Sequence, residues 1–414
     1  MKIFKFGGAS VKNATGVKNL INVLQHEGLE NKVVVVSAMG KMTNAFELVV
    51  NSYLNDNDLL EKSLNNVVNF HLEIATNLFQ KDHSVFNEIG LLFSELKTFL
   101  KTNTTADYNF VYDQIVCYGE LLSTKIVSAY LQECDLKNSW VDVREIIKTD
   151  HNYRKARVDW KKTAQNCKSI INTSKLTITQ GFISSDSSGT TTTLGREGSD
   201  FTAGILGYCL DAESVTIWKD VDGVLNADPR VFETTTLLQQ ISYQEAIEMA
   251  FYGASVIHPK TLKPLENKKI PLYVRSFSNI ENKGTKVGKG LQIDPKKPCF
   301  IVKKNQILVS ISANDFSFMV EENISDIFKL LHDFKLKVNL IQNSALSFSV
   351  CIEDNFKNFQ AFYNKLHPNF KVKYNTGLTL YTIRHFNESS IKEIEKKGTV
   401  LLKQISRETI QVVI

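Results

Sequence analysis

The hydrophobic positions of the first 275 residues alternate between strand-like and helix-like patterns. Residues 3–6 form a short apolar run, and apolar residues then recur over 17–24 with the spacing of one helix face. Four consecutive valines at 33–36 are typical of a strand that is buried on both faces of a parallel sheet. The pattern therefore predicts an α/β fold, a three-layer αβα sandwich around a mostly parallel sheet.

The rest of this region continues the alternation. In the helix expected over 112–131, apolar residues occupy one side, which leaves Glu120 and Ser123 turned away from that stripe. Ser242 and Glu245 have the spacing of a capping box and mark the start of another helix. The other elements expected here are a helix-rich stretch over 44–100, a hairpin of strands over 176–183 and 190–194, and strands over 215–218 and 272–274.

A change of composition near residue 278 indicates a second region. Residues 279–298 are rich in Lys, Gly and Pro without periodicity, so we expect a linker between a large domain over 1–278 and a smaller C-terminal region. Over 299–375 the patterns have the order strand, helix, strand, strand, helix, strand, which is the ferredoxin-like arrangement. The pattern begins again over 376–414, which predicts a second, shortened copy of this module.

Composition narrows the classes of function. A chain of 414 residues with 43% hydrophobic and 22% charged residues is that of a globular protein with two or three domains. The net charge is only +5, no basic arm is present, and the pI is near 8.6. We therefore expect acidic or phosphorylated small molecules as partners and no nucleic acid.

Neither a targeting segment nor a metal motif is evident. Charges interrupt the first eight residues, and the longest apolar run is strand-sized, so we expect a cytoplasmic protein without a membrane span. The six cysteines contain no Cys-x-x-Cys pair, which favours reduced thiols in the core. The eight histidines show no ligand spacing either, and we assign no metal ligands.

Two turns that come after predicted strands combine glycine with polar residues. Residues 5–10 (Lys-Phe-Gly-Gly-Ala-Ser) lie where backbone N–H groups can approach an anion and where Lys5 supplies a positive charge. Residues 37–44 come after the second buried strand, and ligands of open α/β sheets bind beyond the carboxyl ends of strands. The alternative is two ordinary turns, with Ser10 capping a helix, because the chain has neither a P-loop nor a standard dinucleotide motif.

Charged residues gather in two later segments. In 195–200 (Gly-Arg-Glu-Gly-Ser-Asp), Arg196 can bind a carboxylate or a phosphate through its guanidinium group. Asp200 is either a helix cap or an acceptor for an ammonium group or a metal-associated water. In 218–230, aspartates come after a strand beside a basic residue, which suits a nucleotide–Mg²⁺ site, although surface turns also collect Asp and Gly.

Taken in order, these segments closely resemble the aspartate kinases of the amino acid kinase family. The resemblance covers the whole length, because the two small modules look like the paired ACT domains of those enzymes. Since the sequence stops where a fused homoserine dehydrogenase would begin, the expectation is a monofunctional enzyme. The matching segments are 5–8, 37–40, 119–120, 180–183, 191–196, 198–200, 228–230, 252–254 and 258–259.

The resemblance implies ATP-dependent phosphorylation of the L-aspartate side-chain carboxylate to 4-phospho-L-aspartate, the first step toward lysine, threonine and methionine. By similarity, Lys5 and the Gly7 and Gly8 amides hold the transferring phosphate, and Mg²⁺ bridges the nucleotide phosphates. Arg196 is assigned to a substrate carboxylate, and Glu120 and Asp200 to orienting the substrate ammonium or the basic side chains. The implied sites are catalytic (Lys5, Gly7, Gly8, Asp200), substrate-binding (Ser37, Thr43, Glu120, Arg196, Gly198, Ser199) and nucleotide-binding (Lys5, Gly8, Ser10, Lys219, Asp220, Leu225, Arg230).

Five positions depart from the family pattern. Ala9 stands where Thr is usual, and Glu197 where Gly is usual. In the nucleotide region, Lys219 replaces a common Thr, Leu225 a common Tyr and Ser255 a common Lys. One hypothesis is that Lys219 compensates for the charge missing at Ser255.

The two modules depart further. In lysine-inhibited relatives, acidic residues of the first module help to bind the amino groups of the effector. The matching positions carry Asn339 and Ala345, and Glu322 stands where Gly is expected, so we predict weak or altered lysine inhibition. By the same resemblance, the strand over 299–304 would complete the second module, and paired ACT domains imply a homodimer.

Two other functions stay open. A different carboxylate kinase of the family, of the glutamate, acetylglutamate or carbamate type, would resemble only the core and would lack both the paired modules and the Gly-Ser-Asp segment at 198–200. A catalytically silent amino-acid sensor would be favoured by the loss of Lys5, Glu120, Arg196 or Asp200, and all four are present.

Overall fold

A computed structural model describes residues 1–172, 174–254, 257–315 and 317–414, with the side chain of Asn57 left aside. The chain divides into two compact units. The first consists of Met1–Val224, Leu237–Ile247 and Val256–Ile293, and the second of Leu225–Thr236, Glu248–Ser255 and Asp294–Ile414.

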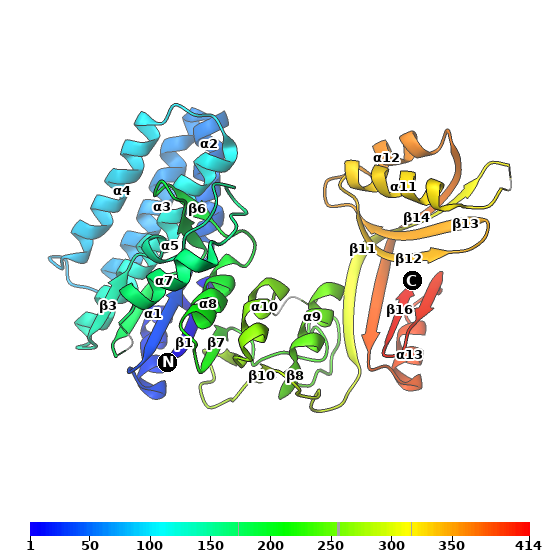
Figure 1. Ribbon diagram of the computed structural model, residues 1–414. Coiled ribbons are helices and arrows are strands. Elements are labelled where there is room, and N and C mark those ends of the chain that lie inside the picture. The colour runs from blue at the N-terminus through cyan, green and yellow to red at the C-terminus, as the bar shows by residue number, and fades with distance from the viewer. Residues whose placement is uncertain (173, 255–256, 316) are drawn as a thin grey trace. The chain divides into compact units, whose positions relative to one another are not determined.

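The first unit is built on a sheet in which the described strands have the order β3-β4-β2-β1-β7-β9-β10-β8 (Figure 1). Every described pair from β3 to β9 is parallel, and β10 is antiparallel to β9. This confirms the mostly parallel sheet. The strands are β1 (Lys2–Phe6), β2 (Lys32–Val36), β3 (Asn138–Val141), β4 (Leu176–Gln180), β7 (Ser214–Lys219), β8 (Gln240–Ser242), β9 (Leu272–Ser276) and β10 (Thr285–Gly288).

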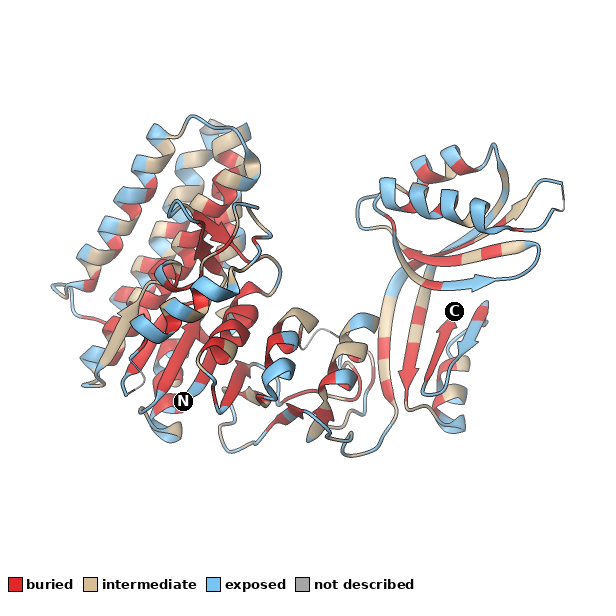
Figure 2. Ribbon diagram, viewed as in Figure 1, coloured by how far each residue is buried: buried red, intermediate tan, exposed pale blue. Residues whose placement is uncertain are grey.

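Helices cover both faces of this sheet, because side chains alternate between the faces along each strand. Phe4 and Phe6 belong to the core under α1, α2, α4 and α5. Ile3 and Val215 lie under α8, where a Cβ on Gly207 would come within 2.7 Å of Val215. The three-layer αβα arrangement is therefore confirmed, and Figure 2 shows its strands as largely buried. The helices are η1 (Gly8–Val11), α1 (Ala14–Glu27), α2 (Met42–Asn55), α3 (Asn57–Thr76), α4 (Val85–Thr102), α5 (Tyr108–Glu133), α6 (Val143–Ile146), α7 (Trp160–Ile170), α8 (Gly198–Cys209), α9 (Tyr243–Tyr252) and α10 (Pro259–Lys268).

None of the helices in the described part of the chain combines the length and the apolar composition that crossing a bilayer requires.

The strand expected over 176–183 is two strands. β4 ends at Gln180, and Phe182 adopts a left-handed backbone with φ of 68°, so the chain leaves the sheet there. β5 (Ile183–Ser185) then pairs with β6 (Thr191–Thr193) as a separate hairpin. Glycine is required directly after β4, since a Cβ at Gly181 would come within 2.4 Å of the Ser199 Cβ.

Three short strands have no counterpart in the hydrophobic pattern. β3 and β8 are only four and three residues long, and β10 lies inside the range expected to be a linker. β10 is held by polar contacts as well as by pairing. The buried Thr285 hydroxyl donates to the Leu238 carbonyl at 2.5 Å and accepts from the Val224 N–H at 2.8 Å. Because these contacts are polar, β10 has no apolar periodicity from which a strand could be predicted.

The second unit contains an antiparallel sheet whose described strands have the order β12-β13-β11-β14-β16-β15, like the paired modules expected. Its two central strands, β11 and β14, are each fifteen residues long. The elements are β11 (Cys299–Ala313), α11 (Glu321–Asp333), β12 (Lys337–Asn343), β13 (Ser347–Glu353), α12 (Phe359–Leu366), β14 (Phe370–Arg384), α13 (Glu388–Glu395), β15 (Leu402–Ile405) and β16 (Thr409–Val413).

The two modules share their central strands. The strands expected over 370–374 and from 379 onward are one continuous strand, β14, so the expected break between them is wrong. The pairing of β14 with β11 shifts register between Lys303 and Leu308, which marks the boundary between the modules within the strands themselves. In the second half of β14, Leu380–Arg384 pairs with residues 299–303 of β11.

Asp113 of α5 anchors the loop and the hairpin that precede α8. This buried carboxylate accepts from the backbone N–H of Arg154 at 2.9 Å and from the N–H and hydroxyl of Thr193 at 2.9 and 2.7 Å. Burial raises the pKa of Asp113 to about 6, and these hydrogen bonds oppose the rise in part. Three donors from two segments therefore depend on one side chain.

We expect Asp113→Ala to lower the free energy of unfolding by about 3 kcal/mol, because it leaves buried donors without an acceptor. Asp107→Ala is the matched control. Asp107 caps the exposed start of the same helix by accepting from Asn109, and its loss should remove only about 1 kcal/mol. Urea unfolding of both variants measures the difference, and equal losses would contradict the anchoring role.

Candidate active site

Three of the segments singled out in the sequence, 5–10, 37–44 and 218–230, lie at the ends of strands that finish at one edge of the sheet, whereas 195–200 comes after β6 of the separate hairpin. β1, β2, β4 and β7 are parallel neighbours, so their carboxyl ends lie together. The chain passes from β1 to β2 on one side of β1, and β7 later pairs on its other side. Such a reversal of strand order is where open α/β sheets bind ligands.

The glycine-containing turns after β1 and β2 meet each other. The Gly40 N–H donates to the Gly8 carbonyl at 2.9 Å. A Cβ at Gly8 would come within 2.5 Å of the Gly40 carbonyl oxygen and 2.8 Å of that of Ala38. Glycine is therefore required at position 8 by the close approach of two backbones. This brings together two segments that lie about thirty residues apart in the sequence.

Ser10 lies in the short helix η1 and does not cap α1. The cap of α1 is Asn13, whose side-chain oxygen accepts from the Gly16 N–H at 2.9 Å. The alternative interpretation of Ser10 as a helix cap is therefore wrong. Its buried hydroxyl has no hydrogen-bond partner among the described residues. A buried hydroxyl beside two glycines offers a hydrogen bond to a ligand such as a phosphate.

Two ammonium groups flank the carboxylate of Asp200. Lys5 Nζ lies 2.6 Å from Asp200 Oδ1, and Lys219 Nζ lies 3.5 Å from Oδ2. The Asp200 and Lys5 side chains are only 4% and 9% exposed, and that of Lys219 is 21% exposed. Burial by itself would raise the pKa of Asp200, but the charges of Lys5 and Lys219 outweigh it and hold the pKa below its usual value. The carboxylate is thus ionised between two cations.

Asp200 reaches this position because α8 begins close to the sheet. A Cβ at Gly198 would come within 2.6 Å of the Phe182 ring, so the first turn of α8 packs tightly against the end of β4. The N-cap residue is Glu197, not Asp200, and Glu197 makes no side-chain capping bond. The helix-cap interpretation of Asp200 is therefore wrong. Glu197 has a φ of 53°, a backbone conformation that glycine adopts more easily.

Glu120 lies on the other side of the same strand ends. α5 packs so closely on the β2 turn that a Cβ at Gly119 would come within 3.1 Å of the Ala38 side chain. The Ala38 N–H donates to Glu120 Oε1 at 3.4 Å, and Ser123 donates to the Ser37 carbonyl at 2.7 Å. The buried Oε2 has no hydrogen-bond partner among the described residues. Burial raises the pKa of Glu120 to about 8, partly opposed by the Ala38 N–H.

The remaining substrate-site candidates lie beside these groups in the chain. Thr43 is in the first turn of α2, directly after the β2 turn, and Ser37 begins that turn. Ser199 is buried next to Asp200. Arg196 is exposed in the turn that leads into α8, four residues before Asp200.

The residues predicted to bind the nucleotide are divided between the two compact units. Lys219 and the exposed Asp220 belong to the first unit, at the end of β7, whereas Leu225 and Arg230 belong to the second unit. The Arg230 guanidinium binds Asp228 at 2.7 and 3.0 Å and is exposed. A nucleotide role for Leu225 and Arg230 stays a prediction. Ser255, to which Lys219 was linked by hypothesis, lies outside the described residues.

The ion pair between Lys219 and Asp200 was missed in the sequence. The signal that could have revealed it is the alternation of side chains along paired strands. Lys5 is in register with Ile217 of β7, so Lys219, two residues further, points to the same face as Lys5. That face is the one covered by α8, which carries Asp200.

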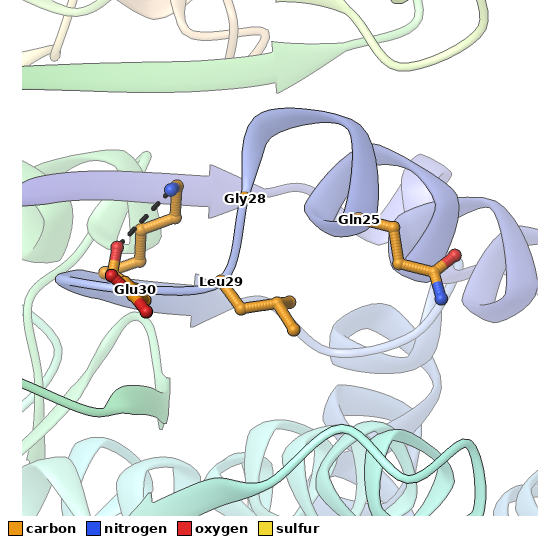
Figure 3. Close-up of a pocket in the computed structure, with 5 residues that line it drawn as sticks. Gln25, Gly28, Leu29 and Glu30 are labelled. Carbon is orange, nitrogen blue, oxygen red and sulfur yellow. Dashed lines mark hydrogen bonds between the residues drawn. The ribbon is translucent and has the colours of Figure 1, made fainter.

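Two concave regions elsewhere in the first unit contain none of the predicted site residues. Figure 3 shows one, of about 500 Å³, beside the start of β2, the end of that strand opposite to the candidate site. The other, of about 340 Å³, lies among α7, α8 and α10. The first is lined by Gln25, Gly28, Leu29, Glu30 and Lys32, and the second by Trp160, Phe201, Tyr208, Lys260, Lys263, Pro264 and Asn267.

Comparison with known proteins points to one family. Residues 1–276 match the model of the amino acid kinase family. The chain is 30% identical over 356 residues to the lysine-sensitive aspartokinase 3 of Escherichia coli strain K12, covering 85% of this chain and 78% of that protein. It superposes on the crystal structure of E. coli aspartokinase III in complex with aspartate and ADP with a TM-score of 0.80 at 26% identity, covering 100% and 96% of the two chains.

Longer relatives match as well. The chain is 31% identical over 388 residues to the chloroplastic bifunctional aspartokinase/homoserine dehydrogenase 2 of Arabidopsis thaliana, covering 91% of this chain and 42% of that protein. The chain thus spans about two fifths of the length of the bifunctional relatives that it matches.

We expect stability to depend on pH through Glu120. A carboxyl group with a raised pKa binds its proton more tightly when folded. The stabilisation that Glu120 contributes to the free energy of unfolding is therefore fully present below about pH 4.5. It decreases as the pH rises and is lost above about pH 8. Glu120→Gln removes the titrating group. The free energy of unfolding of this variant should therefore fall less between pH 5 and 8 than that of the wild type. Parallel curves in urea unfolding across this range would contradict the assignment.

Proposed function

Because the chain belongs to the amino acid kinase family and, within it, to the aspartokinases, we propose that it transfers the γ-phosphoryl group of ATP to the side-chain carboxylate of L-aspartate. The product is 4-phospho-L-aspartate, which enters the synthesis of lysine, threonine and methionine. The observation that carries the proposal is the cluster of the buried Lys5 and Asp200 with the partly exposed Lys219, beside the joined turns of Gly8 and Gly40. A related enzyme of known structure holds aspartate and ADP.

The chemistry of this edge suits a transferring phosphate. Lys5 supplies a positive charge, the Gly7 and Gly8 backbone supplies N–H donors without side chains in the way, and the Ser10 hydroxyl is unpaired among the described residues. Lys5 and Lys219 together exceed the charge of Asp200 by one positive unit. An anion therefore gains a favourable electrostatic interaction at this position.

The aspartate substrate is held by groups on either side of the phosphate. The Arg196 guanidinium binds a substrate carboxylate, and the Thr43 hydroxyl, Ser37 and the segment of Gly198 and Ser199 add hydrogen bonds. Glu120 accepts the substrate ammonium. Because a nearby cation favours the ionised form of a carboxyl group, Glu120 releases its proton when the ammonium binds.

Transfer needs no base from the protein. The side-chain carboxylate of aspartate is ionised at neutral pH, so one of its oxygens attacks the γ-phosphorus directly, and the bond from phosphorus to the bridging oxygen of ADP breaks. Nucleophile, phosphoryl group and leaving group are all anionic. The role of the protein is therefore to align them and to neutralise their repulsion, which is the part of Lys5 and of the backbone donors.

Nucleotide binding extends along the end of β7 to Lys219 and Asp220. Asp200 does not fit a magnesium ligand, because ammonium groups occupy both of its oxygens. Mg²⁺ would instead reach the site with the phosphates of ATP, and it would neutralise part of their charge.

The proposal extends to the second unit. The kinase domain extends beyond residue 278 to include β10, and residues 299–375 and 376–414 form two ACT modules, which serve an amino-acid effector and a homodimer in the cytoplasm. Asn339, at an expected effector position, is already engaged. The Lys303 ammonium donates to its Oδ1 at 2.8 Å, and its Nδ2 donates to Gln306 at 2.7 Å.

We expect lysine to inhibit this enzyme weakly, because Asn339 carries no negative charge and binds Lys303 instead. Aspartate-dependent turnover is measured against lysine, threonine and methionine in separate titrations. Asn339→Asp should restore little sensitivity, since the Lys303 ammonium would neutralise the new carboxylate. Inhibition by lysine as strong as that of the lysine-sensitive relative from E. coli, tested in the same assay, would contradict this expectation.

We expect Lys5→Ala to reduce turnover at least ~1,000-fold while leaving the fold intact, because it removes the charge that neutralises the phosphoryl group. Trapping the acyl phosphate with hydroxylamine measures turnover, with aspartate, glutamate and N-acetylglutamate as alternative acceptors. Lys2→Ala, an exposed lysine on the same strand, is the control and should stay near the wild-type rate.

Each result bears on a particular alternative. A hydroxamate formed with glutamate or N-acetylglutamate but not with aspartate would favour another carboxylate kinase. No hydroxamate with any acceptor would favour an amino-acid sensor, and a rate retained in Lys5→Ala would remove the role assigned to Lys5.

A further inference from the structure

Lys219 is a candidate for a direct part in catalysis. It is the last residue of β7, the strand that pairs with β1 (Figure 1). By the register of this pair, its side chain lies on the sheet face that carries Lys5 and that α8 covers. Its ammonium is 3.5 Å from the Asp200 oxygen opposite to the one that Lys5 contacts. A threonine hydroxyl, expected at this position from the family resemblance, could not form this ion pair.

The arrangement holds two cations close together. Two ammonium groups this close repel each other, and the repulsion is strong in a largely buried site. The carboxylate between them offsets it. Asp200 offsets one charge and leaves the other in excess. The lower pKa of Asp200 agrees with this geometry, because both lysines act to keep its carboxylate ionised.

We propose that Lys219 binds the transferring γ-phosphoryl group together with Lys5, with Asp200 fixing the separation of the two ammonium groups. This inference rests on the proposed function and gives Lys219 a task different from general nucleotide binding. A phosphoryl group in transfer spreads negative charge over three oxygens, so two cations at a set separation stabilise it better than one. The bond between the aspartate carboxylate oxygen and the γ-phosphorus forms, and the bond from the γ-phosphorus to the bridging oxygen of ADP breaks. Lys219 exchanges no proton in this step.

The test compares Lys219→Met and Lys219→Arg, with Lys286→Met as the control from an exposed position on β10 of the same sheet. In calorimetric titrations with MgATP and MgADP in the absence of aspartate, Lys219→Met should weaken ATP binding ~10-fold and leave ADP binding within about twofold. With aspartate, Lys219→Met should lower kcat ~100-fold and leave the KM for aspartate within about threefold. Lys219→Arg should recover most of kcat, because the cation is kept.

Two outcomes would overturn the inference: equal weakening of ATP and ADP binding in Lys219→Met, or a kcat within about threefold of the wild type. Thermal unfolding checks that each variant folds, and Lys219→Thr replaces Lys219→Met should the latter not fold. A wild-type protein that binds ATP and ADP without phosphorylating aspartate would refute the proposed function. The difference between ATP and ADP binding would still decide the role of Lys219.

Discussion

A carboxylate buried between two ammonium groups is the constraint on which this site depends. Removing a charged group from water is strongly unfavourable unless opposite charges and hydrogen bonds replace the lost hydration. Asp200 is only 4% exposed, and the positive charges of Lys5 and Lys219 both stabilise its anionic form. This fixes the start of α8 relative to β1 and β7, and it gives the site a positive charge before any ligand binds.

Close approach of backbones makes that arrangement possible. Gly8 fits against Gly40, Gly181 against Ser199, and Gly198 against Phe182, each at a distance that a Cβ would not allow. The turns after β1, β2 and β4 can therefore lie near α8 with little between them but main chain. The absence of side chains at Gly7 and Gly8 would also let a phosphate approach the backbone, which ties the packing of the first unit to the chemistry proposed for it.

In the second unit, two small modules are joined through shared strands. β11 and β14 run through both modules, so main-chain hydrogen bonds connect them without a flexible link. Near the register shift, Lys303, Asn339 and Gln306 form a chain of hydrogen bonds that satisfies polar groups within the unit. A side chain engaged in this way is less available to a free amino acid.

The sequence by itself determined the α/β class and the mostly parallel sheet, because these depend on local signals, and it named Lys5 and Asp200, whose side chains the structure brings together. Runs of valine mark buried strands, apolar periodicity marks helices, and Lys5, Glu120, Arg196 and Asp200 stand in segments with a recognisable order. Only the tertiary structure decided that Lys219 joins Asp200, that β4 stops at Gln180 and that β14 is continuous. Each of these depends on contacts between residues far apart in the chain, and no local pattern encodes such contacts.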